Sequence, residues 1–383
     1  MSYEYLEENV IPVKLAKEIG RVEEKIVPLS AKDEERAMRL HKESILIDFH
    51  IHLTILPENL RDMDTLARSG RPGTGFEGVK RSGLTACLNG YGGSMGRRSS
   101  PTPWQFQDMV WDLGIRTADH DHHPDAVMRA YSAKDILEAK KTGKAAIFPA
   151  IENGQMIDND LDRVDVLYGL GVRCLGLSYN SRTTVADGCT ERTDAGVSTF
   201  GFKVIDRMNR LGMLIDLSHS SDLASKETID ASKAPCCFTH TFARAAFNNP
   251  RGKTDALLKL IAQKGGVIGL AAVPNLISRK PVQTIFDVMD HVDYMVKLVG
   301  IDHVAIGTDC MYGDHVEMHK YMRGVMNMGK ALDEFPAPFV EYIENPGQWS
   351  NFARALVVRG YSDEPAKKIL GENVLRLLRQ TIG

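Results

Sequence analysis

The stretch FGFKVIDRMNRLGMLIDLSH, residues 200–219, contains both elements of the repeating unit that decides the fold. Residues 200–211 carry apolar side chains at helical spacing, and residues 213–219 form a short apolar run that ends in Ser218 and His219. A continuous run without alternation is typical of a strand buried on both faces of a parallel sheet. The stretch therefore predicts a helix followed by a parallel strand.

Seven more apolar runs of the same kind flank this unit, and amphipathic segments such as 133–141 and 284–298 lie between them. Eight strands that alternate with helices predict an α/β fold of the (β/α)8 TIM-barrel type. A doubly wound sheet is disfavoured because no GxGxxG follows the first strand. The eight predicted strands are 45–53, 83–91, 145–152, 172–179, 213–219, 235–240, 266–272 and 304–310.

The rest of the chain is assigned around this barrel. Residues 1–44 are charged and helix-like, in LAKEIGRVEEKI and KDEERAMRLHKES, and we expect an N-terminal helical extension there. We treat residues 45–383 as one barrel domain. Two segments rich in Gly, Ser and Pro, 57–80 and the roughly fifty residues between the second and third strands, are expected to be long loops on the active face. The cluster His120, His122 and His123 is expected in a solvated turn of the second segment.

Composition excludes several classes of protein. The 383 residues are 43% hydrophobic and 25% charged, which is ordinary for a globular domain and excludes disordered and collagen-like chains. The formal net charge of -3 provides no basic field for nucleic acid. The start MSYEYLEENV is acidic and lacks a basic region followed by an apolar one, so we expect no secretory signal, and no run is long enough to span a membrane. The six cysteines show no CxxC pair, so we expect reduced thiols and a cytoplasmic protein.

Polar residues end the predicted strands, and this placement carries the chemistry. On a barrel, the C-terminal ends of the strands converge on one mouth. Buried imidazoles and carboxylates are costly unless they are paired or bind a metal. The set therefore predicts a site for one or two divalent ions, with zinc expected and manganese, iron or cobalt as alternatives. The predicted ligands are His50, His52, Glu152, His219 and His240.

The same residues suggest a reaction. A metal ion lowers the pKa of bound water towards about 7, and two ions bridged by Glu152 would also polarise a carbonyl group. Asp309, at the end of the eighth strand, can accept the proton of the water and deliver it to a leaving amine. Amide, ester and lactone bonds all suit this layout. His315 follows in the next loop and is expected to line the substrate pocket, and Asp48 is expected to orient the first ligands from behind.

These residues lie in stretches that resemble the membrane (renal) dipeptidase family, zinc metallopeptidases of the amidohydrolase superfamily. The similarity spans about 145–380, and the stretch 207–219 carries it most specifically. The matching stretches, in chain order, are AIENG, GVRCLGLSYNSRTTVADG, FGFKVIDRMNRLGMLIDLSHSSD, FTHTFARAAFNNPRG, GIDHVAIGTD and GENVLRLL.

The resemblance implies roles for individual residues. It implies that Glu152 bridges two zinc ions, that His219 and His240 hold one, and that His50 with residue 52 holds the other. It implies that Asp309 is the acid–base group and that Arg251 binds the carboxylate of a small-molecule substrate. It also suggests a homodimer.

The chain departs from the family at three positions. His50-x-His52 replaces His-x-Asp, so a neutral ligand stands where the family has an anion. This change lowers metal affinity, acidifies the bound water or leaves one site poorly filled, and the sequence does not rank these outcomes. Tyr179 stands where the family has a histidine, and its phenol could stabilise an oxyanion as a catalytic and substrate-binding group. Asn153 stands where the family has glycine.

Two hypotheses follow. The first is a dipeptidase-like hydrolase that cleaves a C–N bond in a small substrate bearing a carboxylate. The alternative keeps the metal but makes the enzyme a lyase, isomerase or deaminase acting on a small acid, or a hydrolase of lactones or cyclic amides. A non-catalytic binding protein is disfavoured because Asp309 is present.

Overall fold

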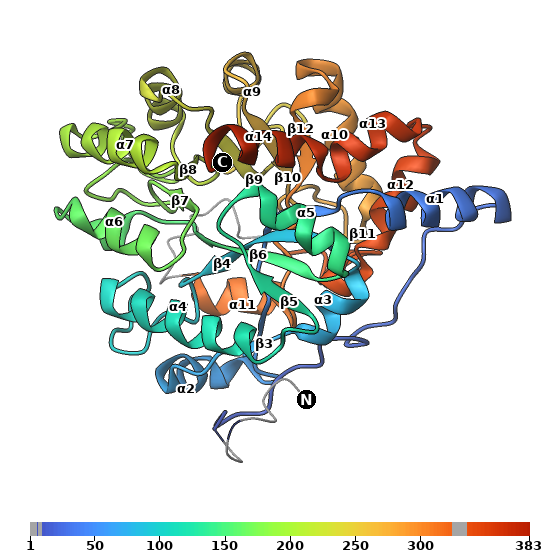
Figure 1. Ribbon diagram of the computed structural model, residues 1–383, viewed down its shortest axis with the longest axis horizontal. Coiled ribbons are helices and arrows are strands. Elements are labelled where there is room, and N and C mark those ends of the chain that lie inside the picture. Colours follow the sequence, from blue (N-terminus) through green and yellow to red (C-terminus); the bar gives the residue numbers. More distant parts are fainter. Residues whose placement is uncertain (1–5, 7–9, 324–334) are drawn as a thin grey trace.

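Eight parallel strands form the barrel in the computed structural model, which describes residues 6, 10–323 and 335–383. Their order in the sheet follows the sequence, and all eight predicted strands are confirmed, each shorter than its apolar run. Figure 1 shows the ring of helices outside them. The strands are β1 (Ile47–Ile51), β4 (Ala86–Tyr91), β6 (Ala145–Ile151), β7 (Cys174–Gly176), β8 (Leu214–Asp216), β9 (Cys237–Thr241), β10 (Val267–Leu270) and β12 (Val304–Ile306).

The barrel closes between its first and last strands. The backbone N–H of Asp309 donates to the carbonyl of His50 at 2.8 Å, and the N–H of His52 donates to the carbonyl of Cys310 at 2.8 Å. The buried carboxylate of Asp48 in β1 accepts from the N–H of Thr308 at 2.9 Å and from its hydroxyl at 2.6 Å. These bonds close the seam beside His50 and His52, two of the predicted metal ligands.

Helices cover the outside of the barrel and one of its ends. The predicted helices at 133–141, 200–211 and 284–298 are confirmed as α5 (Ala133–Thr142), α7 (Thr199–Leu211) and α10 (Ile285–Val299). The other helices are α1 (Ala31–Glu43), α2 (Met63–Ser69), α3 (Phe76–Ser82), α4 (Phe106–Asp121), α6 (Asp162–Gly169), α8 (Asp222–Ala231), α9 (Asp255–Gln263), α11 (His315–Met322), α12 (Ser350–Val358), α13 (Asp363–Lys367) and α14 (Asn373–Thr381).

The interior of the barrel is a packed apolar core. Ile47, Phe49 and Phe148 point inward from the strands and form one buried cluster with Val374 and Leu378 of α14. Helix α14 thus plugs the end of the barrel at which the strands begin, the end that faces the reader in Figure 1. Because this end is filled, a site for small molecules is left at the opposite mouth.

The N-terminal prediction is half right. Residues 31–43 are helical, but 15–26 are not, and Leu15 instead bridges Pro57. Helix α1 contacts the barrel domain: Glu34 accepts from the guanidinium of Arg354 in α12 at 2.7 and 2.9 Å. We expected a helix in 15–26 because the segment is charged and helix-like. A local sequence pattern does not reveal that Leu15 pairs with Pro57, about forty residues further along the chain.

The two expected loops contain more regular structure than predicted. Residues 57–80 include α2, most of α3 and β3 (Gly73–Thr74), which pairs with β2 (Thr54–Ile55). The segment after β4 contains α4, and β5 (Val127–Arg129) adds to β6 outside the barrel order. The expectation of a solvated turn was wrong for His120, which is buried in the last turn of α4. In the segments that follow β10 and β12, β11 (Gln283–Thr284) pairs with β13 (Val340–Glu341).

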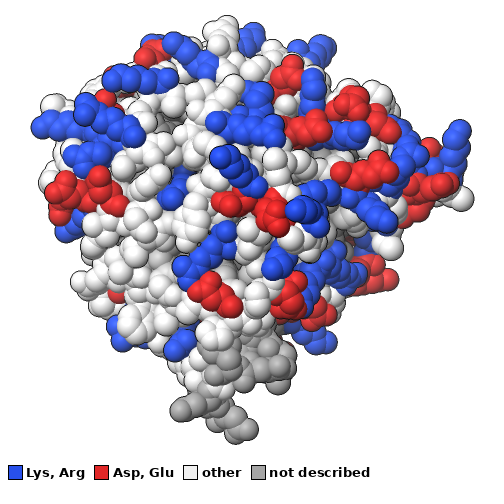
Figure 2. All heavy atoms as spheres, in the orientation of Figure 1, with Lys and Arg blue, Asp and Glu red and all other residues white. Residues whose placement is uncertain are grey.

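Surface properties agree with the composition. Basic and acidic side chains are interspersed over the face shown in Figure 2, without a large area of one sign. None of the described helices combines the length and apolar character required to cross a bilayer. All six cysteines are free thiols.

Candidate metal centre and catalytic site

All five predicted ligands meet at the mouth of the barrel. His50 lies in β1 and His240 in β9, and His52, Glu152 and His219 follow the ends of β1, β6 and β8. Four of the five are at least 94% buried, and His52 is 17% exposed at its side chain, where the site opens to solvent. Strand ends that are far apart in sequence therefore deliver the side chains to one point.

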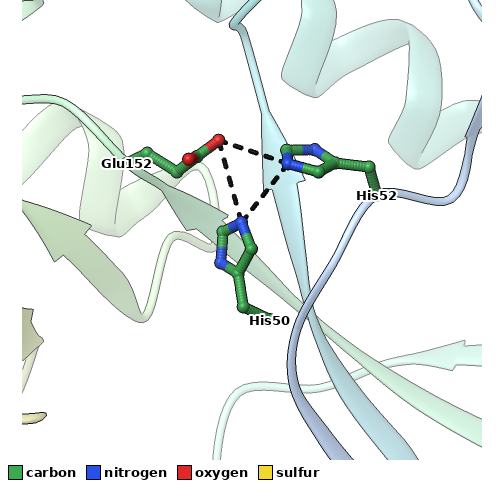
Figure 3. A group of neighbouring side chains, drawn as sticks. All are labelled: His50, His52 and Glu152. Atoms are coloured by element: carbon green, nitrogen blue, oxygen red, sulfur yellow. Dashed lines mark hydrogen bonds and ion pairs between the residues drawn. The ribbon is translucent and has the colours of Figure 1, made fainter. Parts of the chain in front are cut away.

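Glu152 stands between two pairs of histidines. Its Oε1 lies 3.3 Å from Nε2 of His52 and 3.7 Å from Nε2 of His50, and Figure 3 shows these three side chains converging. Its Oε2 lies 3.1 Å from Nε2 of His219 and 3.5 Å from Nε2 of His240. Each carboxylate oxygen thus faces one pair, which is the arrangement that a bridging ligand requires.

The distances within each pair fit a metal ion. The two Nε2 atoms are 3.3 Å apart in the pair His50–His52 and 3.0 Å apart in the pair His219–His240. Two nitrogens bound to one tetrahedral zinc ion at about 2.0 Å are separated by about 3.3 Å. Both imidazole pairs therefore suit a divalent ion, and the two trios that each pair makes with Glu152 are candidate metal sites.

Neighbouring groups hold some of the imidazoles in the orientation that ligation needs. Nδ1 of His219 lies 2.9 Å from Oδ1 of Asn180, and Nδ1 of His240 lies 2.8 Å from the hydroxyl of Thr239. A proton on Nδ1 of His219 leaves Nε2 free to bind a cation. Sequence reasoning missed Asn180 and Thr239, because a single Asn or Thr beside a strand end carries no distinctive pattern.

Asp48 has a different position from the one we expected. Its carboxylate accepts from the backbone N–H of His50 at 3.2 Å and from the indole N–H of Trp349 at 3.0 Å, besides the two bonds to Thr308. Nδ1 of His50 has no hydrogen-bond partner. Asp48 therefore supports the strand that carries His50 and does not orient its imidazole.

The pKa values of His50 and His219, one from each pair, shift in opposite directions. Burial lowers the pKa of His50, but the charges of Glu152 and Asp309 outweigh burial and raise it to about 9. Burial and the charge of Arg251 together hold the pKa of His219 well below its usual range. Burial raises the pKa of the Glu152 carboxyl, but the surrounding histidines outweigh burial and hold this pKa well below normal. Glu152 is thus an anion among imidazoles.

Asp309 lies beside the first pair. Its Oδ1 is 3.1 Å from Nε2 of His52 and 3.8 Å from Nε2 of His50. Burial raises its pKa, but His240, His52 and His50 outweigh burial and hold the pKa well below the usual range, so the carboxylate is ionised at neutral pH. Its backbone φ is 55°, a left-handed conformation that is uncommon outside glycine and that fixes the direction of the side chain.

Three other predicted residues lie at or beside the mouth. The ring of Tyr179 stacks on His219 with 3.8 Å between centroids. Nη2 of Arg251 lies 3.1 Å from Nε2 of His219 and donates to the carbonyl of His240 at 2.9 Å. His315, at the start of α11, lines the same cavity as Tyr179 and Asp309. Their proposed roles in binding and catalysis remain predictions.

The comparisons with known proteins agree with this geometry. A model of the membrane dipeptidase family, peptidase family M19, matches residues 34–382. The chain belongs to this family. Dipeptidase tcpJ of Claviceps purpurea (strain 20.1) is 29% identical over 261 residues, which are 67% of this chain and 56% of that protein. Dipeptidase 3 of Rattus norvegicus is 28% identical over 269 residues, 67% of this chain and 50% of that protein. The chain thus spans about half the length of these curated relatives.

Two solved structures share this fold. An amidohydrolase from Pseudomonas aeruginosa is 29% identical, with a TM-score of 0.76 over 91% of this chain and 99% of that chain. A metallopeptidase from Rhodobacter sphaeroides, solved with a phosphinate mimic of the dipeptide L-Ala-D-Ala, has a TM-score of 0.71 over 88% of this chain and all of that chain. At 19% identity this second likeness shows the fold alone.

Proposed function

We propose that this member of the membrane dipeptidase family is a metal-dependent hydrolase of a C–N bond in a small substrate that bears a carboxylate. The observation that carries the proposal is Glu152, whose two oxygens each face one pair of histidines. Zinc is the ion that a set of imidazole and carboxylate ligands favours, with manganese, iron or cobalt as alternatives. His50, His52, Glu152, His219 and His240 would hold it.

The five predicted ligands would hold metal ions, which would supply Lewis-acid activation of water and of the scissile carbonyl. Asp309 accepts the proton from the attacking water and delivers it to the nitrogen of the leaving group. The water oxygen bonds to the acyl carbon, the C–N bond breaks, and the products are a carboxylic acid and an amine. Asp309 suits this role because it is ionised and lies beside His52 at the solvent-facing side of the site.

Arg251 and Tyr179 have positioning roles in this proposal. The guanidinium of Arg251, 3.1 Å from His219, holds the substrate carboxylate next to the second histidine pair. Tyr179, stacked on His219, presents a phenol to the oxyanion that forms during attack. Burial raises the pKa of Tyr179 well above its usual value, so the hydroxyl keeps its proton and can donate it.

A combined activity and metal assay tests the proposal. Purified protein reloaded with zinc is assayed against dipeptides and N-acyl amino acids, with products identified by mass and bound metal measured by elemental analysis. We expect cleavage with incorporation of one water. Asp309→Asn should reduce kcat by at least about 100-fold and keep the metal content. Metal-loaded protein that cleaves none of these amides would overturn the proposal.

We also propose a cellular compartment and an oligomeric state for the enzyme. The six free thiols support a reducing compartment such as the cytoplasm. A homodimer is proposed from the family resemblance and is tested by light scattering coupled to size-exclusion chromatography. A mass of one chain, 42.5 kDa, at micromolar concentration would contradict it.

A further inference from the structure

The cavity at the barrel mouth lies to one side of the bridging glutamate. It is a concave site at the C-terminal face of the barrel, the place where barrel enzymes bind small molecules. His52, Glu152 and Asp309 line it, whereas His219, His240 and Arg251 are absent from its lining. The open space therefore adjoins the first histidine pair, and the arginine adjoins the second.

This asymmetry fixes the direction in which a substrate lies. A carboxylate held by Arg251 places the leaving amine half of the substrate beside His219 and His240. The scissile carbonyl then lies over Glu152, which stands between the two pairs. The acyl half continues past Glu152 and enters the cavity beside His52.

Apart from the predicted ligands His52 and Glu152 and the carboxylate of Asp309, the walls of the cavity are apolar or uncharged. Leu56, Met95, Met311 and Met318 supply flexible apolar surface, and Gly92 and Gly93 leave space beside them. His315 and His319 of α11 complete one wall, with their ring centroids 4.3 Å apart. Burial lowers the pKa of His315 to about 4 and holds that of His319 well below its usual range, so both imidazoles are neutral at pH 7.

The cavity offers no partner for a charged acyl substituent. Its lining among the described residues contains no lysine or arginine, and its only carboxylates are Glu152 and Asp309. Both of these lie within 3.3 Å of imidazole nitrogens of the metal-ligating set. A charged side chain placed among the methionines would be desolvated without compensation, which is unfavourable.

We propose that this cavity is the acyl-side specificity pocket, and that it selects substrates whose acyl half carries an uncharged, apolar group. Met318 and Ser94 are the side chains at which this selectivity can be changed, because both line the cavity and neither is a ligand or a proton carrier in the reaction. The inference rests on the proposed hydrolase function and adds the chemical class of the acyl group.

Matched substrate pairs test the pocket in the zinc-loaded wild-type protein. The pairs share the leaving alanine and differ in the charge of the acyl side chain: Met-Ala and Leu-Ala against Glu-Ala and Lys-Ala, and N-butanoyl-alanine against N-succinyl-alanine. We expect kcat/KM to be on the order of 100-fold higher for the member whose acyl side chain is uncharged. Equal or higher kcat/KM for the charged members would overturn the inference and leave the hydrolase function intact. Absence of cleavage across all pairs would overturn the hydrolase function itself.

Two variants assign the selectivity to this cavity. Met318→Lys should raise the ratio of kcat/KM for Glu-Ala over Met-Ala by at least about tenfold, because the ammonium supplies the missing partner. If Met318→Lys does not fold, Ser94→Lys provides a second test. It places the same charge at a less buried loop position of the cavity and should change the ratio in the same direction. Glu317→Lys, on the exposed side of the same helix α11, is the control and should keep the wild-type ratio. Wild-type ratios in both cavity variants would overturn the assignment.

Discussion

At the scale of single residues, the replacement of the family's aspartate by His52 depends on Gly90 in β4. An added Cβ at Gly90 would lie 2.4 Å from Cε1 of His52, closer than side chains approach in practice. An imidazole is larger than a carboxylate, and the glycine leaves the room for it. The position of His52, just after β1, therefore depends on the absence of a side chain at Gly90 in β4.

Gly90→Ala should therefore displace His52 and weaken the metal site that His52 shares with His50. We expect zinc bound per chain, measured by elemental analysis after dialysis, to fall by about one ion while the far-UV circular dichroism is unchanged. Gly114→Ala is the control because it lies in α4 with no atom within 4 Å of the added Cβ. Wild-type zinc content in Gly90→Ala would show that His52 is not a ligand.

At the scale of elements, the seam between β1 and β12 depends on one buried carboxylate. Asp48 accepts hydrogen bonds from Thr308 after β12, from Trp349 before α12 and from the backbone of His50. Burial raises the pKa of Asp48 to about 6, with the hydrogen bonds opposing this shift. The charge is retained at neutral pH because four donors surround it.

Asp48→Ala leaves those donors buried without an acceptor. We expect the free energy of unfolding to fall by roughly 3 to 5 kcal/mol, measured by urea denaturation at pH 7.5 in the presence of a chelator. Asp48→Asn keeps one acceptor oxygen and should lose less. A loss below about 1 kcal/mol in Asp48→Ala would mean that the seam is held by other contacts.

At the scale of the whole molecule, buried neutral histidines outside the metal centre link stability to pH. Burial lowers the pKa of His41 to about 4, and burial together with the charge of Arg116 lowers that of His120 to about 3. An unfolded histidine has a pKa of about 6.5. Between about pH 6.5 and 4 the unfolded chain therefore binds protons that the folded chain does not.

The free energy of unfolding should accordingly fall as pH decreases below about 6.5, by roughly 1.4 kcal/mol per pH unit for each such histidine. In His120→Phe the unfolded chain binds one proton fewer. The slope of the free energy of unfolding against pH, between pH 6.5 and 5, should therefore be smaller than in the wild type by about 1.4 kcal/mol per pH unit. Chemical denaturation at several pH values measures both slopes. Parallel curves would show that His120 is protonated in the folded protein.

Metal ions should also stabilise the folded molecule without being required for folding. The ligands come from four strands, so bound metal links distant parts of the barrel, while the apolar core and α14 pack independently of it. A ligand present at 100 times its Kd adds about 2.7 kcal/mol to stability. Chelation should lower the Tm and leave the circular dichroism native, and zinc should restore the Tm. An unchanged Tm would argue against tight metal binding.

The sequence alone determined the element types and the residues at the strand ends. The apolar run 304–310 and its terminal Asp309 are local features, and burial on both faces leaves a local pattern that is readable without a structure. The same holds for the His50-x-His52 pair, which period-two geometry places on one side of a strand. Periodicity is weaker in 15–26 and in the helix that ends near His120. The predictions for these two segments were wrong because they lack such a local pattern.

Only the tertiary structure decided how these pieces fit together. It fixed which oxygen of Glu152 faces which histidine pair, the bond between Asp48 and Thr308 across 260 residues, and the room that Gly90 leaves for His52. It also placed the apolar cavity beside His52 and Arg251 beside His219. The physical reason is that these relations join segments that are remote in sequence, so they depend on strand register and side-chain packing, which a local pattern does not record.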